Sequence, residues 1–258
     1  MGTAIREIIQ YRSLLRNLVA RDVKIRYRRS ALGVAWTMLN PLLMMVVFTL
    51  VFAHFLRFSI AHFPIYFLCG FLLWNFFAQA TSWSTACFVG YAPLLRKIYL
   101  PKAVLVLATV LSGLINLALS LVPLALLMLV EGYSFSIYLM FLPVALLLAA
   151  AFALGVSLLL APLCVLFADI AQIYQVVLVA WMYLTPIFYP LEIVPPEYRV
   201  LVTANPMTHF VETFRAPIYS GTLPDGGTLL AAATAAAAAL VVGWITFQHY
   251  SDRVAYHI

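Results

Sequence analysis

Residues that could carry out catalysis are few and scattered in this sequence. The five histidines, His54, His62, His209, His249 and His257, form no spaced ligand set with cysteines or acids of the kind that binds a metal. Glu192, Glu197 and Glu212 do lie near His209, and a membrane-embedded enzyme acting on a glycolipid could use such a cluster for proton transfer. We favour ordinary charged residues on surface helices and keep the enzyme as an alternative.

Energy coupling is also restricted by the residues present. None of the three lysines, Lys24, Lys97 and Lys102, follows the glycine of a GxxxxGK[ST] phosphate-binding loop. If ATP drives this protein, another chain must bind it, so we expect no cofactor or metal in this chain. Transport coupled to protons or sodium usually needs ionisable groups in mid-membrane. The long apolar segments contain no Asp, Glu, Lys or Arg, which argues against that mechanism.

The composition shows which solvent surrounds the chain. Of its residues 65% are hydrophobic and 9% are charged, with a mean hydropathy of +1.03, whereas a soluble domain has about 25% charged residues. Six uncharged stretches each hold at least 22 residues, and about 20 apolar residues cross a bilayer as a helix. The sequence therefore predicts an all-α integral membrane protein in a single transmembrane domain, 1–258. We expect six transmembrane helices, over 34–56, 63–89, 103–130, 137–165, 170–188 and 228–250.

The positive charges predict the orientation of these helices. With six spans, 12 of the 15 lysines and arginines fall on the side of the termini, and Arg57, Arg199 and Arg215 fall on the other side. Because loops rich in Lys and Arg stay in the cytoplasm, we expect both termini to be cytoplasmic. Cys69, Cys87 and Cys164 lie inside predicted spans, where cysteine is usually a small apolar residue.

Three segments outside the spans have features of their own. Residues 1–29 predict a cationic amphipathic helix at the membrane interface, resting on anionic headgroups and able to meet a protein partner; no base-reading module indicates nucleic acid. Residues 92–102 predict a short cytoplasmic helix between two prolines that docks a partner or rests on lipid. Residues 189–227 predict an external or re-entrant helix pair, because Pro195-Pro196 and Asn205-Pro206 are helix-starting sequences.

Aromatic and polar residues recur on particular faces of three spans. The first span carries Trp36, Phe48, Phe52 and Phe55, and the fifth carries Tyr174, Trp181 and Phe188, followed by Tyr189. Such rows could stack on sugar rings, or they could be ordinary packing and interfacial belts. The later part of the second span is polar, with Asn75, Gln79, Thr81, Ser82, Ser84 and Thr85. Polar groups in lipid need partners, so this face should point at protein or water.

Four motifs, in order, carry a family resemblance over most of the chain. They are RYRRSALGVAWTMLNP (26–41), PLLRKIYLPK (93–102), FADIAQIYQVVLVAWMYLTPIFYP (167–190) and ANPMTHFVETFR (204–215). Together they resemble the motifs of type-two ABC exporter permeases, which serve O-antigen, capsule and teichoic-acid export. Ala92, Ala168 and Thr185 depart from the residues common in that family, Asn, Arg and Ser, at the coupling loop and the ends of the fifth span.

The resemblance implies a function, partners and site residues. It implies a homodimer in the bacterial inner (plasma) membrane, bound to two separately encoded ATPase subunits that hold ATP and Mg, exporting a lipid-linked polysaccharide from the cytoplasmic to the outer face. A drug or lipid exporter of the same fold is the alternative. Spans one and five, with their aromatic rows, would line the channel, and the helices of 195–219 would form an external gate. The implied ATPase-coupling residues are Leu94, Leu95, Arg96, Lys97, Ile98, Tyr99, Arg21 and Lys24, and the implied turn at the cytoplasmic entrance is Ser30, Leu32 and Gly33.

Overall fold

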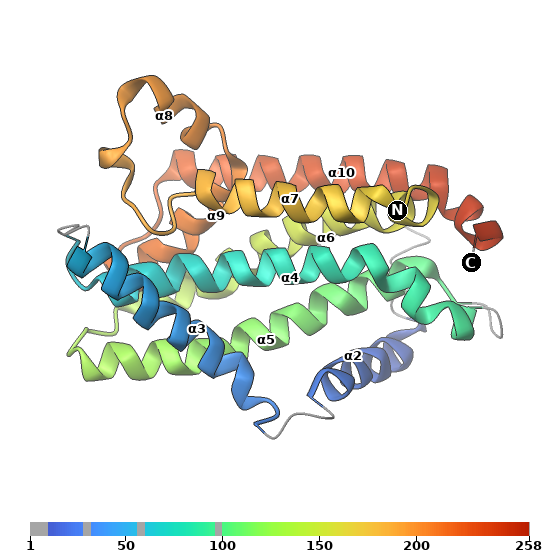
Figure 1. Ribbon diagram of the computed structural model, residues 1–258, viewed down its shortest axis with the longest axis horizontal. Coiled ribbons are helices and arrows are strands. Elements are labelled where there is room, and N and C mark those ends of the chain that lie inside the picture. The colour runs from blue at the N-terminus through green and yellow to red at the C-terminus, as the bar shows by residue number, and fades with distance from the viewer. Residues whose placement is uncertain (1–9, 28–31, 56–59, 96–99, 258) are drawn as a thin grey trace.

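The computed structural model describes residues 10–27, 32–55, 60–95 and 100–257, and all regular elements in these ranges are helical. Long helices run side by side along one axis of the molecule (Figure 1). The transmembrane-length elements are α3 (Ala35–Phe48) with the π-helix η1 (Thr49–Phe55), α4 (Phe63–Leu95), α5 (Lys102–Val130), the 3₁₀ turn η2 (Ile137–Phe141) with α6 (Leu142–Leu166), and α10 (Gly226–His257). The shorter ones are α2 (Arg12–Tyr27), α7 (Asp169–Leu184), η3 (Leu191–Ile193), α8 (Pro196–Thr203), α9 (Pro206–Arg215) and the π-helix η4 (Ala216–Ser220).

Five helices in the described ranges are long and apolar enough to cross a membrane, where the sequence predicted six. The difference lies in α7, which ends at Leu184 after 16 residues instead of reaching 188. Thr185 precedes Pro186, and the proline ring disfavours the helical conformation of the residue before it. Residues 185–189 therefore form bends. α7 packs against α4 and α6, and Figure 1 shows it running alongside α4.

One further boundary differs from the sequence prediction. α4 continues through Pro93 to Leu95, so residues 92–95 belong to this helix and are not a separate coupling helix. Proline is tolerated in such helices where neighbouring groups satisfy the freed backbone. The interface helix is described as α2 from Arg12 to Tyr27. Residues 1–9, 28–31 and 96–99 lie outside the described residues, and with them Ser30, Arg96, Lys97, Ile98 and Tyr99.

α4 forms the centre of the bundle. Its span window is 72% buried, against 6% for that of α3, and it packs on α5, α6, α7 and α9. Polar groups on its buried faces are satisfied locally: the Thr81 hydroxyl donates to the Phe77 carbonyl at 2.7 Å, and Ser84 Oγ and Thr109 Oγ1 are 2.8 Å apart. α3, by contrast, leaves most of its apolar surface uncovered by this chain.

α6 and α10 make the closest helix contact. A Cβ atom on Gly243 would overlap the carbonyl oxygen of Gly155, so the two backbones touch at this point. The alanine-rich sequence of α10 suits this contact, because small residues let membrane helices approach closely. Figure 1 shows α10 along the upper edge of the bundle, and α6 lies between α10 and α4 in the packing.

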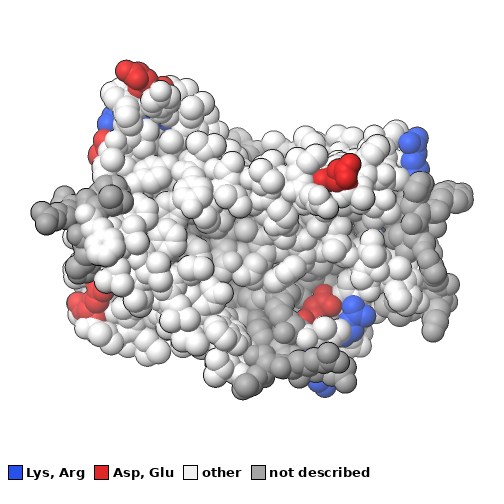
Figure 2. Space-filling view, viewed as in Figure 1, with Lys and Arg blue, Asp and Glu red and all other residues white. Residues whose placement is uncertain are grey.

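Charged side chains of the described residues are unevenly distributed over the surface drawn in Figure 2. On the face drawn in Figure 2, Lys, Arg, Asp and Glu atoms gather toward the two ends of the long axis and leave a broad uncharged band between them. This distribution matches a hydrocarbon layer around the middle of the bundle.

Candidate functional site

A row of polar side chains runs along one face of α4. Asn75, Gln79, Ser82 and Trp83 recur at helical spacing and are all partly exposed. The Gln79 Nε2 donates to Asn75 Oδ1 at 2.7 Å, and Gln175 of α7 donates from Nε2 to Ser82 Oγ at 3.2 Å. Amide and hydroxyl groups therefore line this surface, and in contact with lipid such groups would need hydrogen-bond partners.

Two adjoining pockets open onto this row. The first, of about 340 Å³, lies among α3, α4 and α5 and is lined by Trp36, Thr37, Asn40, Pro41, Leu72, Asn75, Phe76, Gln79, Trp83, Gly113, Asn116, Leu117 and Ser120. The second, of about 280 Å³, lies between α4 and α7 and is lined by Trp74, Ala78, Gln79, Ser82, Trp83, Gln175, Leu178, Val179 and Met182. Gln79 and Trp83 line both pockets, so the two are neighbours, and together they are here called the polar groove. Every residue in its lining is uncharged.

The start of α3 is held against the polar groove by local geometry. Gly33 adopts the left-handed conformation, with φ +52°, which favours glycine. It begins a turn in which the amide of Trp36 donates to the Gly33 carbonyl at 3.3 Å. The Ser120 hydroxyl of α5 donates to the Thr37 carbonyl at 2.9 Å. These contacts place Trp36 and Asn40 on the wall of the first pocket.

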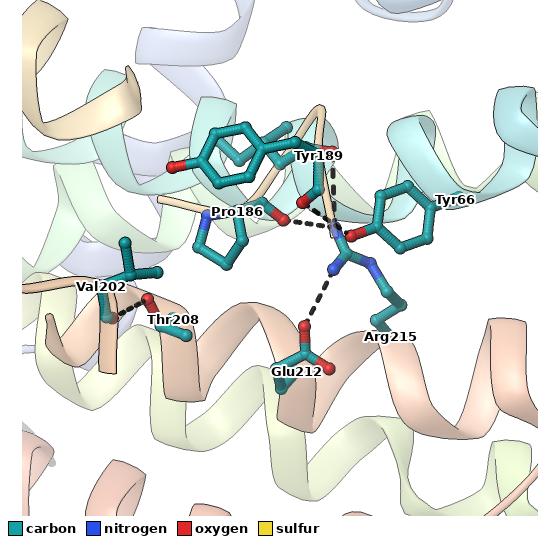
Figure 3. Close-up of polar contacts among 8 residues, drawn as sticks. Tyr66, Pro186, Tyr189, Val202, Thr208, Glu212 and Arg215 are labelled. Carbon is teal, nitrogen blue, oxygen red and sulfur yellow. Dashed lines mark hydrogen bonds and ion pairs between the residues drawn. The ribbon is translucent and has the colours of Figure 1, made fainter. Parts of the chain in front are cut away.

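A buried arginine closes the opposite end of the molecule. Arg215, at the end of α9, is 2% exposed; its Nη2 donates to the Pro186 carbonyl at 3.0 Å and its Nη1 lies 2.9 Å from Glu212 Oε1. Its guanidinium lies 3.8 Å from the centre of the Tyr66 ring, and the Tyr66 hydroxyl donates to the Tyr189 carbonyl at 3.0 Å (Figure 3). Arg215 thus joins α9, α4 and the bend after α7.

Asn205 makes a second junction in the same region. It caps α9 by accepting from the Met207 amide at 3.0 Å, and it also accepts from Trp181 Nε1 at 2.7 Å. Its amide nitrogen donates to the Leu184 carbonyl at 3.2 Å and to Thr185 Oγ1 at 3.0 Å. The third and fourth sequence motifs are therefore bonded to each other through Asn205 and Arg215.

Tyrosine hydroxyls complete this end of the bundle. Tyr189 donates to the Tyr183 carbonyl at 2.9 Å, and Tyr219 donates to the Ala61 carbonyl at 2.6 Å. Burial raises the pKa of both tyrosines, which keeps the hydroxyls protonated and able to donate.

At the other end, α2 is bonded to the end of α4. The Tyr91 hydroxyl donates to Asp22 Oδ1 at 2.6 Å, and the Arg21 guanidinium lies 4.2 Å from the centre of the Tyr91 ring and 3.5 Å from Asp22. The contact, here called the α2–α4 latch, lies one residue before the segment predicted to couple to an ATPase.

The predicted channel residues occupy different environments. Phe48 and Phe52 stack with the buried Phe188, and Tyr174 is buried with its hydroxyl 2.7 Å from Thr81 Oγ1. Trp181 packs on Trp74, Phe77 and Phe152. Tyr189 is partly buried, Phe55 is 78% exposed and Trp36 lines the polar groove. In this conformation most of the two aromatic rows pack inside one chain, and their contact with a substrate stays a prediction.

The predicted coupling and entrance residues are described only in part. Leu95 packs beside the cluster that holds Tyr91, Arg21 belongs to the α2–α4 latch, and Lys24 is exposed. The side chain of Leu94 lies outside what the structure describes. Leu32 is exposed beside Gly33 at the start of α3. Contact of these residues with an ATPase stays a prediction.

The residues of the alternative enzyme are not joined into a site. His209 Nε2 lies 2.9 Å from the Thr203 carbonyl, and Glu212 pairs with Arg215. Within the described ranges no hydrogen bond or ion pair connects His209 with Glu192, Glu197 or Glu212, and no group of three potential metal ligands occurs.

Several residues of the polar groove were not among the predicted site residues. Asn75, Gln79 and Ser82 had given a signal, since their polarity indicated a face turned to protein or water. Asn40, Trp83 and Gln175 gave none, because single polar or aromatic residues in three different spans reveal no common face until the helices are packed.

Five apolar helices of membrane-spanning length in the described part of the chain, beside an open groove lined by uncharged side chains, define a multi-pass membrane protein. The chain belongs to the ABC-2 type transporter family, whose model matches residues 13–219. It is 33% identical over 251 residues to the O-antigen export system permease protein RfbA of Myxococcus xanthus, covering 96% of this chain and 95% of that protein. It is 25% identical over 211 residues to a protein of the same name from Klebsiella pneumoniae, covering 81% and 82% of the two chains.

Proposed function

We propose that this chain is the permease subunit of an ATP-driven exporter that carries a lipid-linked, O-antigen-like polysaccharide from the cytoplasmic to the outer face of the bacterial inner membrane. The polar groove is the observation that carries the proposal. Its amides can donate and accept hydrogen bonds with sugar hydroxyls, and the indole rings of Trp36 and Trp83 offer apolar faces to the C–H side of a sugar. The names of the relatives agree with this substrate class.

The absence of charge in the groove lining suits a long neutral polymer. A charged side chain would hold a passing glycan by strong local hydrogen bonds. Neutral amides exchange partners at small net cost, because each bond lost is replaced by another of similar strength. The chain then acts as a conduit and breaks no bond in the substrate.

The topology of this proposal has six crossings. α7 rises about 24 Å at 1.5 Å per residue, and the bends of 185–189 extend it toward the outer face beside α4. With this sixth crossing both termini lie in the cytoplasm. α9, buried by contacts with α4, α6 and α10, would be a re-entrant helix, and the Arg215 and Asn205 junctions would hold an external gate shut.

We further propose a homodimer with two ATPase subunits bound to its cytoplasmic side, where ATP and Mg would be held. α3 and α7 expose aliphatic side chains beside the polar groove, among them Val46, Val47, Val176 and Val179. These faces are the natural place for a second copy, whose approach would enclose the groove. The 92–102 segment and the α2–α4 latch would receive the movement of the ATPases.

The exposed aliphatic faces also support a second candidate, a lipid exporter of the same fold. A lipid substrate would slide along Val46 and Val176, whereas a glycan would use Gln79 and Asn75. Flipping of a fluorescent phospholipid by the purified complex, at a rate comparable with glycan export, would favour this second candidate.

Replacement of Gln79 by Leu tests the proposal, because Gln79 is shared by both pockets. We expect the rate of polysaccharide export to fall at least tenfold, which corresponds to a loss of about 1.4 kcal/mol of interaction free energy with the glycan. Assembly and ATP hydrolysis should persist. The matched control is Gln248→Leu, on an exposed position of α10. Unchanged export in Gln79→Leu would remove the groove from the substrate path.

A further inference from the structure

A second groove lies away from the polar groove, where α2 packs against α5. Its volume is about 570 Å³, and apolar side chains of the two helices form its lining except for two arginines, Arg12 and Arg16. The lining residues contributed by α5 are Leu111, Leu114, Ile115 and Ala118. This α2–α5 groove therefore has an apolar floor and a cationic edge.

The two arginines form a single cationic group. Arg12 and Arg16 stand four residues apart, so they are neighbours on one face of α2, and both are exposed. Among the described residues neither makes an ion pair; the acid of α2, Asp22, is engaged by Tyr91 and Arg21. Like charges at this spacing repel each other, so an anion placed between them would stabilise the helix.

The floor of the α2–α5 groove is an apolar face of α5. Leu111, Leu114, Ile115 and Ala118 recur at i, i+3, i+4 and i+7 on one face of α5, inside its candidate membrane span. They lie 9 to 16 residues beyond Lys102, or about 14–24 Å at 1.5 Å per residue. Ile115 is 41% exposed, so this chain does not cover the floor. The groove therefore joins the cationic face of α2 to an apolar face of α5.

We propose that the α2–α5 groove binds one anionic glycerophospholipid. Its phosphate lies between Arg12 and Arg16, and one acyl chain follows the face of α5 from Leu111 to Ala118. Both halves of the groove contribute to this assignment: a free phosphate would leave the apolar floor uncovered, and an acidic protein surface would not enter hydrocarbon. The cytoplasmic leaflet contains anionic lipids, which attract arginines at the membrane interface. The apolar part of an arginine side chain can pack against the lipid while its guanidinium contacts the headgroup.

The bound lipid fixes the position of α2 on the membrane. The α2–α4 latch transmits that position to the end of α4, because Asp22 is bonded to Tyr91. An anionic lipid in the α2–α5 groove therefore fixes the position of the end of α4, where the 92–102 segment begins, relative to the membrane surface.

Photo-crosslinking tests the site in the intact permease complex in nanodiscs. The probe is phosphatidylglycerol with a diazirine on one acyl chain, compared with the same probe on phosphatidylcholine. We expect phosphatidylglycerol to label peptides containing Leu111–Ala118, and phosphatidylcholine to label them weakly. Excess glycerol 3-phosphate should not displace the label, which distinguishes a lipid from a soluble phosphate.

Three variants give the controls. The R12Q/R16Q protein should need roughly 30-fold more phosphatidylglycerol for half-maximal labelling. Ala20→Phe, which fills the groove and keeps both arginines, should also lose the label, whereas Lys24→Gln, outside the groove on the same helix, should keep it. Equal labelling by phosphatidylcholine, full labelling of R12Q/R16Q, or displacement by glycerol 3-phosphate overturns the proposal.

Discussion

At the scale of the residue, Arg215 shows how the sequence motifs become a structure. Its guanidinium satisfies the Pro186 carbonyl, pairs with Glu212 and covers the Tyr66 ring. A charge that is 2% exposed is stable only where such partners surround it. Glu212, in contrast, has a half-exposed side chain, so water can replace it as a partner.

We predict unequal effects for the two members of this pair. Arg215→Ala should destabilise the protein by about 2–3 kcal/mol, because a buried carbonyl loses its charged donor and Tyr66 loses its cation. Glu212→Gln should cost less than about 1 kcal/mol, since the carboxylate is partly solvated. Unfolding of the detergent-solubilised protein, followed by tryptophan fluorescence, measures both. Equal losses would mean that the ion pair, and not the carbonyl contact, holds the end of α9.

At the scale of the element, the α2–α4 latch links two helices through residues that lie 69 positions apart in the sequence. Tyr91 is buried and directs its hydroxyl at both oxygens of Asp22. A movement of α2 would thus be transmitted to the end of α4, and a movement of the end of α4 would be transmitted to α2.

Tyr91→Phe should uncouple ATP hydrolysis from export. The ring still fills its site, but the bond to Asp22 is lost, so α2 and α4 can move separately. We expect less polysaccharide exported per ATP hydrolysed by the reconstituted complex. Tyr138→Phe, at an exposed position of η2, is the matched control. An unchanged ratio in Tyr91→Phe would show that the latch only stabilises α2.

The close contact of α6 and α10 makes a different prediction. In Gly243→Ala, the added methyl group would meet the Gly155 carbonyl oxygen, and the helices must separate. Overpacking of this kind costs about 1–3 kcal/mol. Gly226→Ala at the start of α10 meets no atom within 4 Å and should leave the thermal midpoint nearly unchanged. Identical midpoints for both variants would contradict the close contact.

The sequence predicts where helices begin and end better than it predicts which helix faces pack against each other. Asn205-Pro206 indicated the start of α9, and the structure confirms the cap, because this signal is local. The end of α7 was placed four residues too late, although Thr185-Pro186 carried the information. The aromatic rows show the limit: a repeat of seven identifies one face of a helix, but Tyr174 and Phe188 prove to face their own bundle.

At the scale of the whole molecule, the polar groove is open to one side of the chain. α4 is surrounded by its neighbours, whereas α3 and the outer side of α7 expose aliphatic surface on both sides of the polar groove. A second copy covering those faces would turn an open groove into an enclosed path, with the Arg215 and Asn205 junctions at one end and the α2–α4 latch at the other.

The measurement that tests this path most directly is crosslinking of the moving glycan. A photoreactive amino acid is placed at Gln79 in the polar groove or at Leu147, an exposed position of α6, in complexes that export radiolabelled polysaccharide. Position 79 should form an adduct with the glycan only while ATP is hydrolysed, and position 147 should form none. Active export with no adduct at position 79, or with equal adducts at both positions, would contradict passage through the polar groove.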